Sequence, residues 1–209
     1  MVCCTLACAC APAPDIPIES SIESTPTSVL ESSRTPLSQP SDAVETDFTL
    51  AQPVLITSLG QSADLLMLTA IIHRLDISYI SSATALPWEL GEAKTVILVA
   101  GVSPKGLTAS GITLADEQLR AEEWATALEE QSDCQVLVAH LGGNARRDNS
   151  TMSLAECVLP AADALLVVTD GDADGYFANY AADAGIPYFS AASVSELQAP
   201  LSRLFTDKE

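Results

Sequence analysis

Short, continuous apolar runs that end in glycine-rich or polar turns set the architecture of this chain. Val136-Leu-Val-Ala139 is one such run, and the segments 95–100 and 164–169 are further expected strands. A short segment that is apolar at every position is typical of a parallel strand with both faces buried. These segments are therefore expected to lie in the interior of a parallel sheet.

Helical segments separate the expected strands, which also include residues 53–58, 77–80 and 187–190. The expected helices span 63–75, a stretch from Thr113 to beyond Leu128, 151–159, 177–184 and a segment after Ser193, with a single turn at 87–90 and a loop at 101–111. Strands that alternate with helices form βαβ units with right-handed crossovers. The sequence predicts an α/β domain over residues 52–206, with an open, mostly parallel sheet of five to six strands and helices on both faces. Flavodoxin-like and Rossmann-like strand orders both fit.

The chain is strongly acidic, with a formal net charge of -19, nine Lys and Arg, and a pI near 4.1. A broad basic surface of the kind that binds nucleic acid is therefore excluded. Any site for an anion must be a local positive spot in a negative field.

Residues 1–10 resemble the end of a bacterial lipoprotein signal peptide. Cys8 follows Thr5-Leu-Ala and Cys10 follows Ala7-Cys-Ala, and both contexts resemble the small-residue motif before a lipidated cysteine. The first basic residue is Arg34, so we expect Met1 to lie within a longer signal peptide. The alternative is a cytoplasmic start in which these cysteines are fortuitous.

Residues 11–51 are rich in Pro, Ser, Thr and Glu, a composition too polar to offset the entropy of ordering. They are expected to form a disordered linker. Together with lipidation at Cys8 or Cys10, it would hold the α/β domain outside the cytoplasm, anchored to the membrane.

The segment from His140 to Asp148 is the main candidate for ligand binding. Gly142 and Gly143 follow a buried strand and allow a sharp turn or a close approach to a ligand, because neither has a Cβ. Arg146 and Arg147 carry planar guanidinium groups that suit carboxylate or phosphate. Open α/β sheets bind ligands beyond the carboxyl ends of their strands, where this segment is expected to lie. The alternative is a connecting loop whose arginines pair with surface carboxylates.

Two further loops should reach the same edge of the sheet, after the strands 53–58 and 95–100. The residues expected to complete a site for a small anion are Gly60, Gln61, Ser62, Ser103, Lys105 and Gly106. Ser62 also suits the N-cap of the following helix, whose free N–H groups attract anions.

No cofactor is predicted. The turn after the first strand lacks the G-x-G-x-x-G spacing of dinucleotide-binding folds, and Gly101-Val-Ser-Pro-Lys-Gly is not a Walker loop. His140 would serve as general base if the protein were an enzyme. The alternative for His140 is a strand-end histidine hydrogen-bonded to a loop carbonyl.

The acidic loop Asp170-Gly-Asp172-Ala-Asp174-Gly resembles the start of a calcium loop. Position twelve of an EF-hand would be Ala181, so an EF-hand is excluded, but another type of calcium loop remains an interpretation. The alternative is a set of acids at a helix N-terminus.

These loops together are similar to an uncharacterised bacterial family of exported proteins, the domain of unknown function 6305 family. The resemblance spans roughly residues 52–205, and its most specific part is His140-Leu-Gly-Gly-Asn-Ala-Arg-Arg147. It implies an extracytoplasmic α/β domain and supplies no activity.

The sequence favours a binding module that holds a small anionic ligand, accessory to a membrane transporter or sensor. Arg146 and Arg147 would contact the anion, while Gly142 and Gly143 would give access to the backbone. A hydrolase or transferase that uses His140, and a pure protein-interaction domain, are the alternatives.

Overall fold

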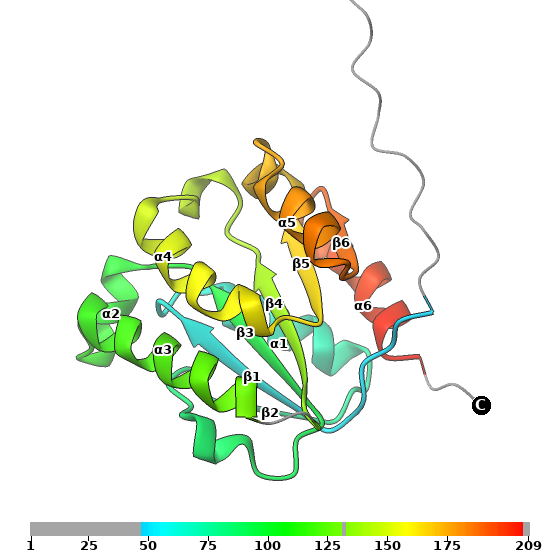
Figure 1. The fold of residues 1–209 in the computed structure, drawn as a ribbon, viewed down its shortest axis with the longest axis horizontal. Coiled ribbons are helices and arrows are strands. Elements are labelled where there is room, and N and C mark those ends of the chain that lie inside the picture. The colour runs from blue at the N-terminus through cyan, green and yellow to red at the C-terminus, as the bar shows by residue number, and fades with distance from the viewer. Residues whose placement is uncertain (1–46, 131–132, 207–209) are drawn as a thin grey trace, which may run out of the picture. The chain divides into compact units, whose positions relative to one another are not determined.

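The computed structural model describes residues 47–130 and 133–206, which form a six-stranded sheet flanked by helices (Figure 1). The strands are β1 Val54–Leu59, β2 Tyr79–Ser81, β3 Thr95–Ala100, β4 Gln135–His140, β5 Ala164–Val168 and β6 Tyr188–Ala191. All neighbouring strands pair in parallel, in the order β2-β1-β3-β4-β5-β6. The predicted open α/β fold is confirmed. The order is that of flavodoxin-like folds, with β6 added at one edge.

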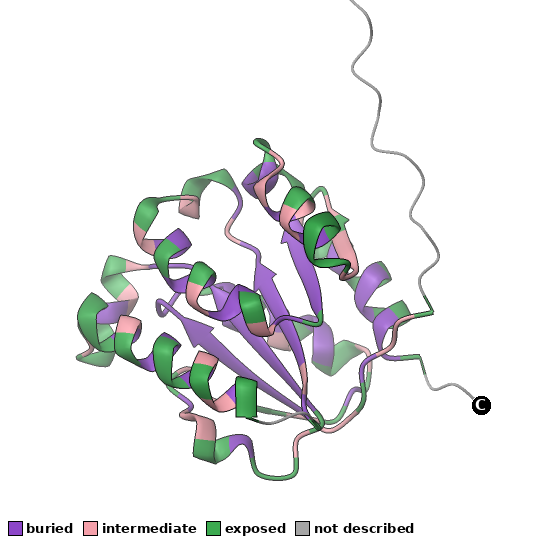
Figure 2. Cartoon of the chain, viewed as in Figure 1, coloured by how far each residue is buried: buried purple, intermediate pink, exposed green. Residues whose placement is uncertain are grey.

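Helices cover both faces of the sheet. The α-helices are α1 Asp64–Arg74, α2 Pro104–Ser110, α3 Leu114–Glu130, α4 Asn149–Val158, α5 Tyr176–Ala184 and α6 Gln198–Leu204. The 3-10 turns are η1 Pro87–Leu90, η2 Asn144–Arg146, η3 Leu159–Ala161, η4 Thr169–Asp172 and η5 Val194–Leu197. Residues of α3, α4 and α5 pack on one face, and residues of α1 and α6 pack on the other. The four inner strands β1, β3, β4 and β5 are buried between them, as Figure 2 shows, whereas the edge strands β2 and β6 are partly exposed.

Strand β1 shows why two separate cores form. Leu55 and Leu59 belong to the core beneath α3 and α4, whereas Val54 and Ile56 belong to the core beneath α1 and α6. Side chains alternate between the faces of a strand, so a strand that is apolar at every position must be covered on both sides.

The segment 101–111, expected to be a loop, contains helix α2. Ser103 is its N-cap and accepts a hydrogen bond from the Gly106 N–H at 3.2 Å. Pro104 occupies the first turn and Gly111 ends the helix in the left-handed conformation, with φ of 67°. These are ordinary signals for the start and end of a helix.

Packing begins slightly ahead of residue 52, the predicted start of the domain. Leu50 is buried, and its N–H donates to the Leu204 carbonyl at 2.7 Å. The predicted lipidation sites Cys8 and Cys10, and most of the predicted linker 11–51, lie outside the described residues. No helix in the described part of the chain is long and apolar enough to span a membrane.

Candidate functional site

The loops after β1 and β3 are joined to each other at the carboxyl edge of the sheet. The Gly101 N–H donates to Leu59 O and the Ser103 N–H to Gly60 O, both at 2.8 Å. Gln61 and Val102 form an additional antiparallel bridge. In flavodoxin-like folds the ligand crevice lies where the strand order reverses, here between β1 and β3. In this protein, the backbone contacts between the loops after β1 and β3 close that crevice.

Gly60 and Gly106, two of the glycines predicted to form the site, lie where these two loops pack against each other. A Cβ added to Gly60, whose φ is 103°, would lie 2.6 Å from the Gly101 carbonyl oxygen. A Cβ on Gly106 would collide with the Gln61 carbonyl oxygen. Glycine at these positions therefore permits close backbone packing.

A buried ionic network that the sequence did not predict supports the same loop. Glu117 on α3 accepts hydrogen bonds from the Gly60 N–H at 2.7 Å and from the Gln61 carboxamide at 2.9 Å. Its carboxylate also pairs with Arg120 at 2.7 Å. Arg120 in turn donates to the carbonyls of Ser58 and Ala85.

Glu117 lies in the first turn of α3, where an acidic side chain complements the helix dipole, but this side chain is fully buried. A signal was available in the sequence. Glu117 and Arg120 lie four residues before Ala121 and Trp124, two apolar residues that are buried on the inner face of α3. Residues at that spacing share one helix face.

Ser62, Asp64 and Arg146 form a polar cluster beside the closed crevice. The Ser62 hydroxyl donates to the Asp64 carboxylate at 2.7 Å and accepts weakly from the Asp64 N–H at 3.3 Å. The buried Asp64 carboxylate lies 3.6 Å from Nε of Arg146. Ser62 thus orients Asp64, and Asp64 attracts Arg146.

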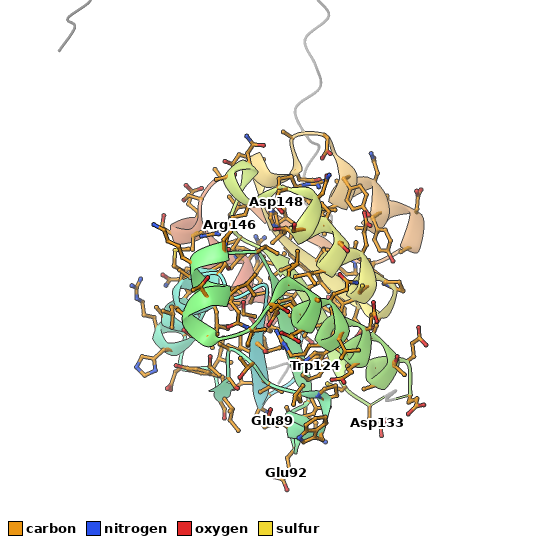
Figure 3. All side chains as sticks on the ribbon, turned by 90° about the vertical axis from the view of Figure 1, so that its left-hand side faces the viewer. Glu89, Glu92, Trp124, Asp133, Arg146 and Asp148 are labelled. Carbon is orange, nitrogen blue, oxygen red and sulfur yellow. The ribbon has the colours of Figure 1, made fainter. Side chains whose placement is uncertain are left out.

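Arg146 reaches across to the loop after β3. Its Nη1 donates to the Val102 carbonyl at 2.9 Å, and its aliphatic stem packs against Gly142, where a Cβ would collide with it. The side chain is 29% exposed, and Nη2 has no hydrogen-bond partner among residues 47–130 and 133–206. Figure 3 shows Arg146 and Asp148 on this side of the molecule. The guanidinium is therefore fixed in place with one nitrogen free.

Lys105 lies in the same region, in the first turn of α2 and three residues beyond Val102. Its side chain is exposed, and no ion pair joins it to another described residue. Ser103, in contrast, is occupied as the N-cap of α2.

Arg147 is held by internal contacts. Nε donates to the Gly171 carbonyl at 3.0 Å, and Nη2 pairs with Asp174 at 3.1 Å. The guanidinium also lies 5.0 Å from the ring centroid of Tyr176 and 5.1 Å from that of Phe177. These contacts join the loop after β4 to the loop after β5, so Arg147 is mainly structural.

His140 is only 1% exposed. Its Nδ1 lies 3.1 Å from the Ala100 carbonyl and its Nε2 3.2 Å from the Gly143 carbonyl, while its ring stacks on Phe177 at 5.5 Å. Both nitrogens therefore face backbone oxygens. This is the arrangement of a strand-end histidine bonded to loop carbonyls, and it leaves no ring nitrogen available to a substrate.

The three aspartates of the predicted calcium loop lie in different surroundings. Asp172 accepts from the N–H groups of Phe177 and Ala178 at 2.8 and 3.0 Å and so caps α5. It also accepts from the Tyr188 hydroxyl at 2.9 Å, and burial together with this bond raises the pKa of Tyr188.

Asp174 pairs with Arg147, and the Asp170 carboxylate lies against Gly143, where it would collide with an added Cβ. Among the described residues no group of three or more His, Cys, Asp or Glu could hold a metal ion. The calcium interpretation stays a prediction, in a structure where Asp172 caps α5 and Asp174 pairs with Arg147.

One protein family matches this chain: the model described as domain of unknown function (DUF6305) covers residues 51–205. The chain belongs to this family. The predicted resemblance is therefore confirmed, and the match covers the whole α/β domain, including the loops around Arg146. No curated protein and no solved structure matches the chain.

Proposed function

We propose that this domain is a non-catalytic module that binds a small anion through Arg146 and Lys105, beside the carboxyl ends of β3 and β4. The observation that carries the proposal is the guanidinium of Arg146: Val102 and Asp64 hold it, the side chain is 29% exposed, and Nη2 is unpaired among the described residues. Such a module would pass or report its ligand to a membrane transporter or sensor.

The geometry supports a binding role because Arg146 is already ordered. A guanidinium that is fixed before the ligand arrives loses little side-chain entropy on binding. Asp64 offsets part of the positive charge of Arg146, and the exposed ammonium of Lys105 adds a second positive group in the first turn of α2. Charge-assisted hydrogen bonds between such cations and an anion are stronger than hydrogen bonds between neutral groups.

A thermal-shift screen tests the proposal, with phosphates, dicarboxylates and tricarboxylates as probes. At least one of them should raise the melting temperature of the wild-type protein. Lys105→Ala should weaken the binding of that anion by about twofold to fivefold, since an exposed cation contributes modestly. Arg74→Ala removes an exposed charge from the end of α1, which runs away from this edge, and should change the affinity by less than about twofold. A wild-type protein that responds to no anion in the panel would contradict the proposal.

We also propose that the module is extracytoplasmic and held at the membrane by a lipid on Cys8 or Cys10. The small residues before these cysteines and the polar segment behind them support this. Mass spectrometry of protein expressed from the full gene in its native host should find an acylated N-terminal cysteine. An unmodified chain that retains Met1 would exclude the anchor.

A further inference from the structure

An open groove lies between η1 and α3 and encloses about 510 Å³. Its apolar lining comes from Pro87, Trp88, Leu119 and Ala127. Its acidic lining comes from Glu122, Glu123 and Glu130, and none of the described residues that line it is basic.

Trp88 is presented to solvent by a turn that is firmly held. Its side chain is 74% exposed, whereas Trp124 is 1% exposed and donates to the Ala85 carbonyl at 3.0 Å. The Leu86 N–H donates to the Glu89 carboxylate at 2.8 Å, and Leu90 is buried beneath the turn. Exposed tryptophan is costly in water and is enriched among the residues that dominate protein interfaces.

The other wall of the groove is one face of α3. Residues 119, 122, 123, 126 and 130 recur at helical spacing, while Glu117, Arg120 and Trp124 are buried toward the sheet. Leu119, which is 58% exposed, lies at the start of this outward face. The face therefore presents an apolar residue followed by carboxylates, with nothing in the described chain covering it.

We propose that this groove docks a basic amphipathic helix of a partner protein. An apolar face of such a helix would cover Trp88 and Leu119, and flanking lysines or arginines would meet Glu122, Glu123 and Glu130. Recognition of an amphipathic helix by a hydrophobic groove is a common binding mode, and complementary charge selects the partner.

The acidic charge of the groove also disfavours two other possible binding partners. A second copy of this chain carries a net charge of -19 and would meet the acidic groove with repulsion. Residues 1–46 of this chain contain one basic residue, Arg34, among several acids. The site is also distinct from the proposed anion site, because Glu89 and Glu92 lie at the opposite end of the molecule from Arg146 in Figure 3.

The test is calorimetric titration with a synthetic helical peptide that has leucine on one face and lysine on both flanks. The wild-type protein should bind it and should bind an analogue with glutamate at every lysine position at least about tenfold more weakly. Trp88→Ala with Leu119→Ala should weaken binding at least about tenfold. The matched control, Leu66→Ala with Ile80→Ala, removes equally exposed apolar residues elsewhere and should change the affinity by less than about twofold.

A second pair of variants tests the role of charge. Glu122→Gln with Glu123→Gln should weaken binding by about fivefold, whereas Glu129→Gln with Asp183→Asn removes the same charge outside the groove and should change it by less than about twofold. The proposal is overturned if the lysine peptide does not bind, if both peptides bind equally, or if the groove variants match their controls. Self-association in sedimentation that Trp88→Ala abolishes would assign the groove to a second copy instead.

Discussion

Glu117→Ala should lower the free energy of unfolding by about 3 to 5 kcal/mol, a large part of the stability of an ordinary domain. The substitution leaves the Arg120 guanidinium buried without its carboxylate partner at 2.7 Å. It also removes the acceptor of the Gly60 N–H and of the Gln61 carboxamide. Removing one member of a buried ion pair costs far more than the pair contributes as a whole.

Urea denaturation of the wild type and the variant measures this effect. Glu129→Ala, on the exposed face of the same helix, is the control and should change the stability by less than about 0.5 kcal/mol. Glu117→Leu with Arg120→Met should be less destabilised than Glu117→Ala, because it leaves no buried charge. A loss of less than about 1 kcal/mol in Glu117→Ala would show that the buried charge is compensated elsewhere.

Gly60→Ala should lower the free energy of unfolding by roughly 2 to 4 kcal/mol. The new Cβ would lie 2.6 Å from the Gly101 carbonyl oxygen and 2.7 Å from Cα of Val102. Both contacts are backbone atoms of the paired loop after β3, so neither can move aside as the end of a flexible side chain would. The bond between Ser103 N–H and Gly60 O would have to shift as well.

Gly185→Ala is the matched control, since Gly185 also has a positive φ, 69°, but nothing lies within 4 Å of an added Cβ. Gly185→Ala should lower the free energy of unfolding only by the cost of a left-handed backbone in a residue with a Cβ, about 1 to 2 kcal/mol. In thermal unfolding, the melting temperature of Gly60→Ala should be clearly lower than that of Gly185→Ala. Equal losses would show that the two loops are not closely packed.

The strands were predictable because their signal is local. β3 and β5 lie in segments that are apolar at nearly every position, and only a strand covered on both faces explains such a short run. Helix α2 was missed although Ser103, Pro104 and Gly111 mark its ends. The same Gly, Ser and Pro residues are equally typical of loops, and periodicity over so short a segment does not separate the two.

The meeting of the loops after β1, β3 and β4 at one edge of the sheet was predictable, but the contacts that each residue makes there were not. A glycine at a strand end allows either ligand access or close packing, and the choice at Gly60 and Gly106 depends on the opposing loop, which the sequence does not specify. Arg146 and Arg147 are adjacent and looked equivalent. Their partners, Val102 and Asp64 for one and Gly171 and Asp174 for the other, come from distant segments that only the folded sheet brings near.

We propose that Arg146 contacts a small anion while Arg147 supports the fold. Calorimetry with an anion that stabilises the wild type, titrated into Arg146→Ala and Arg147→Ala separately, tests it most directly. Arg146→Ala should weaken binding by about tenfold to a hundredfold, the equivalent of one lost charge-assisted hydrogen bond, without unfolding the domain. Arg147→Ala should retain the affinity within about threefold and lower the melting temperature instead. If Arg146→Ala binds the anion as tightly as the wild type, or if only Arg147→Ala loses binding, Arg146 does not form the site.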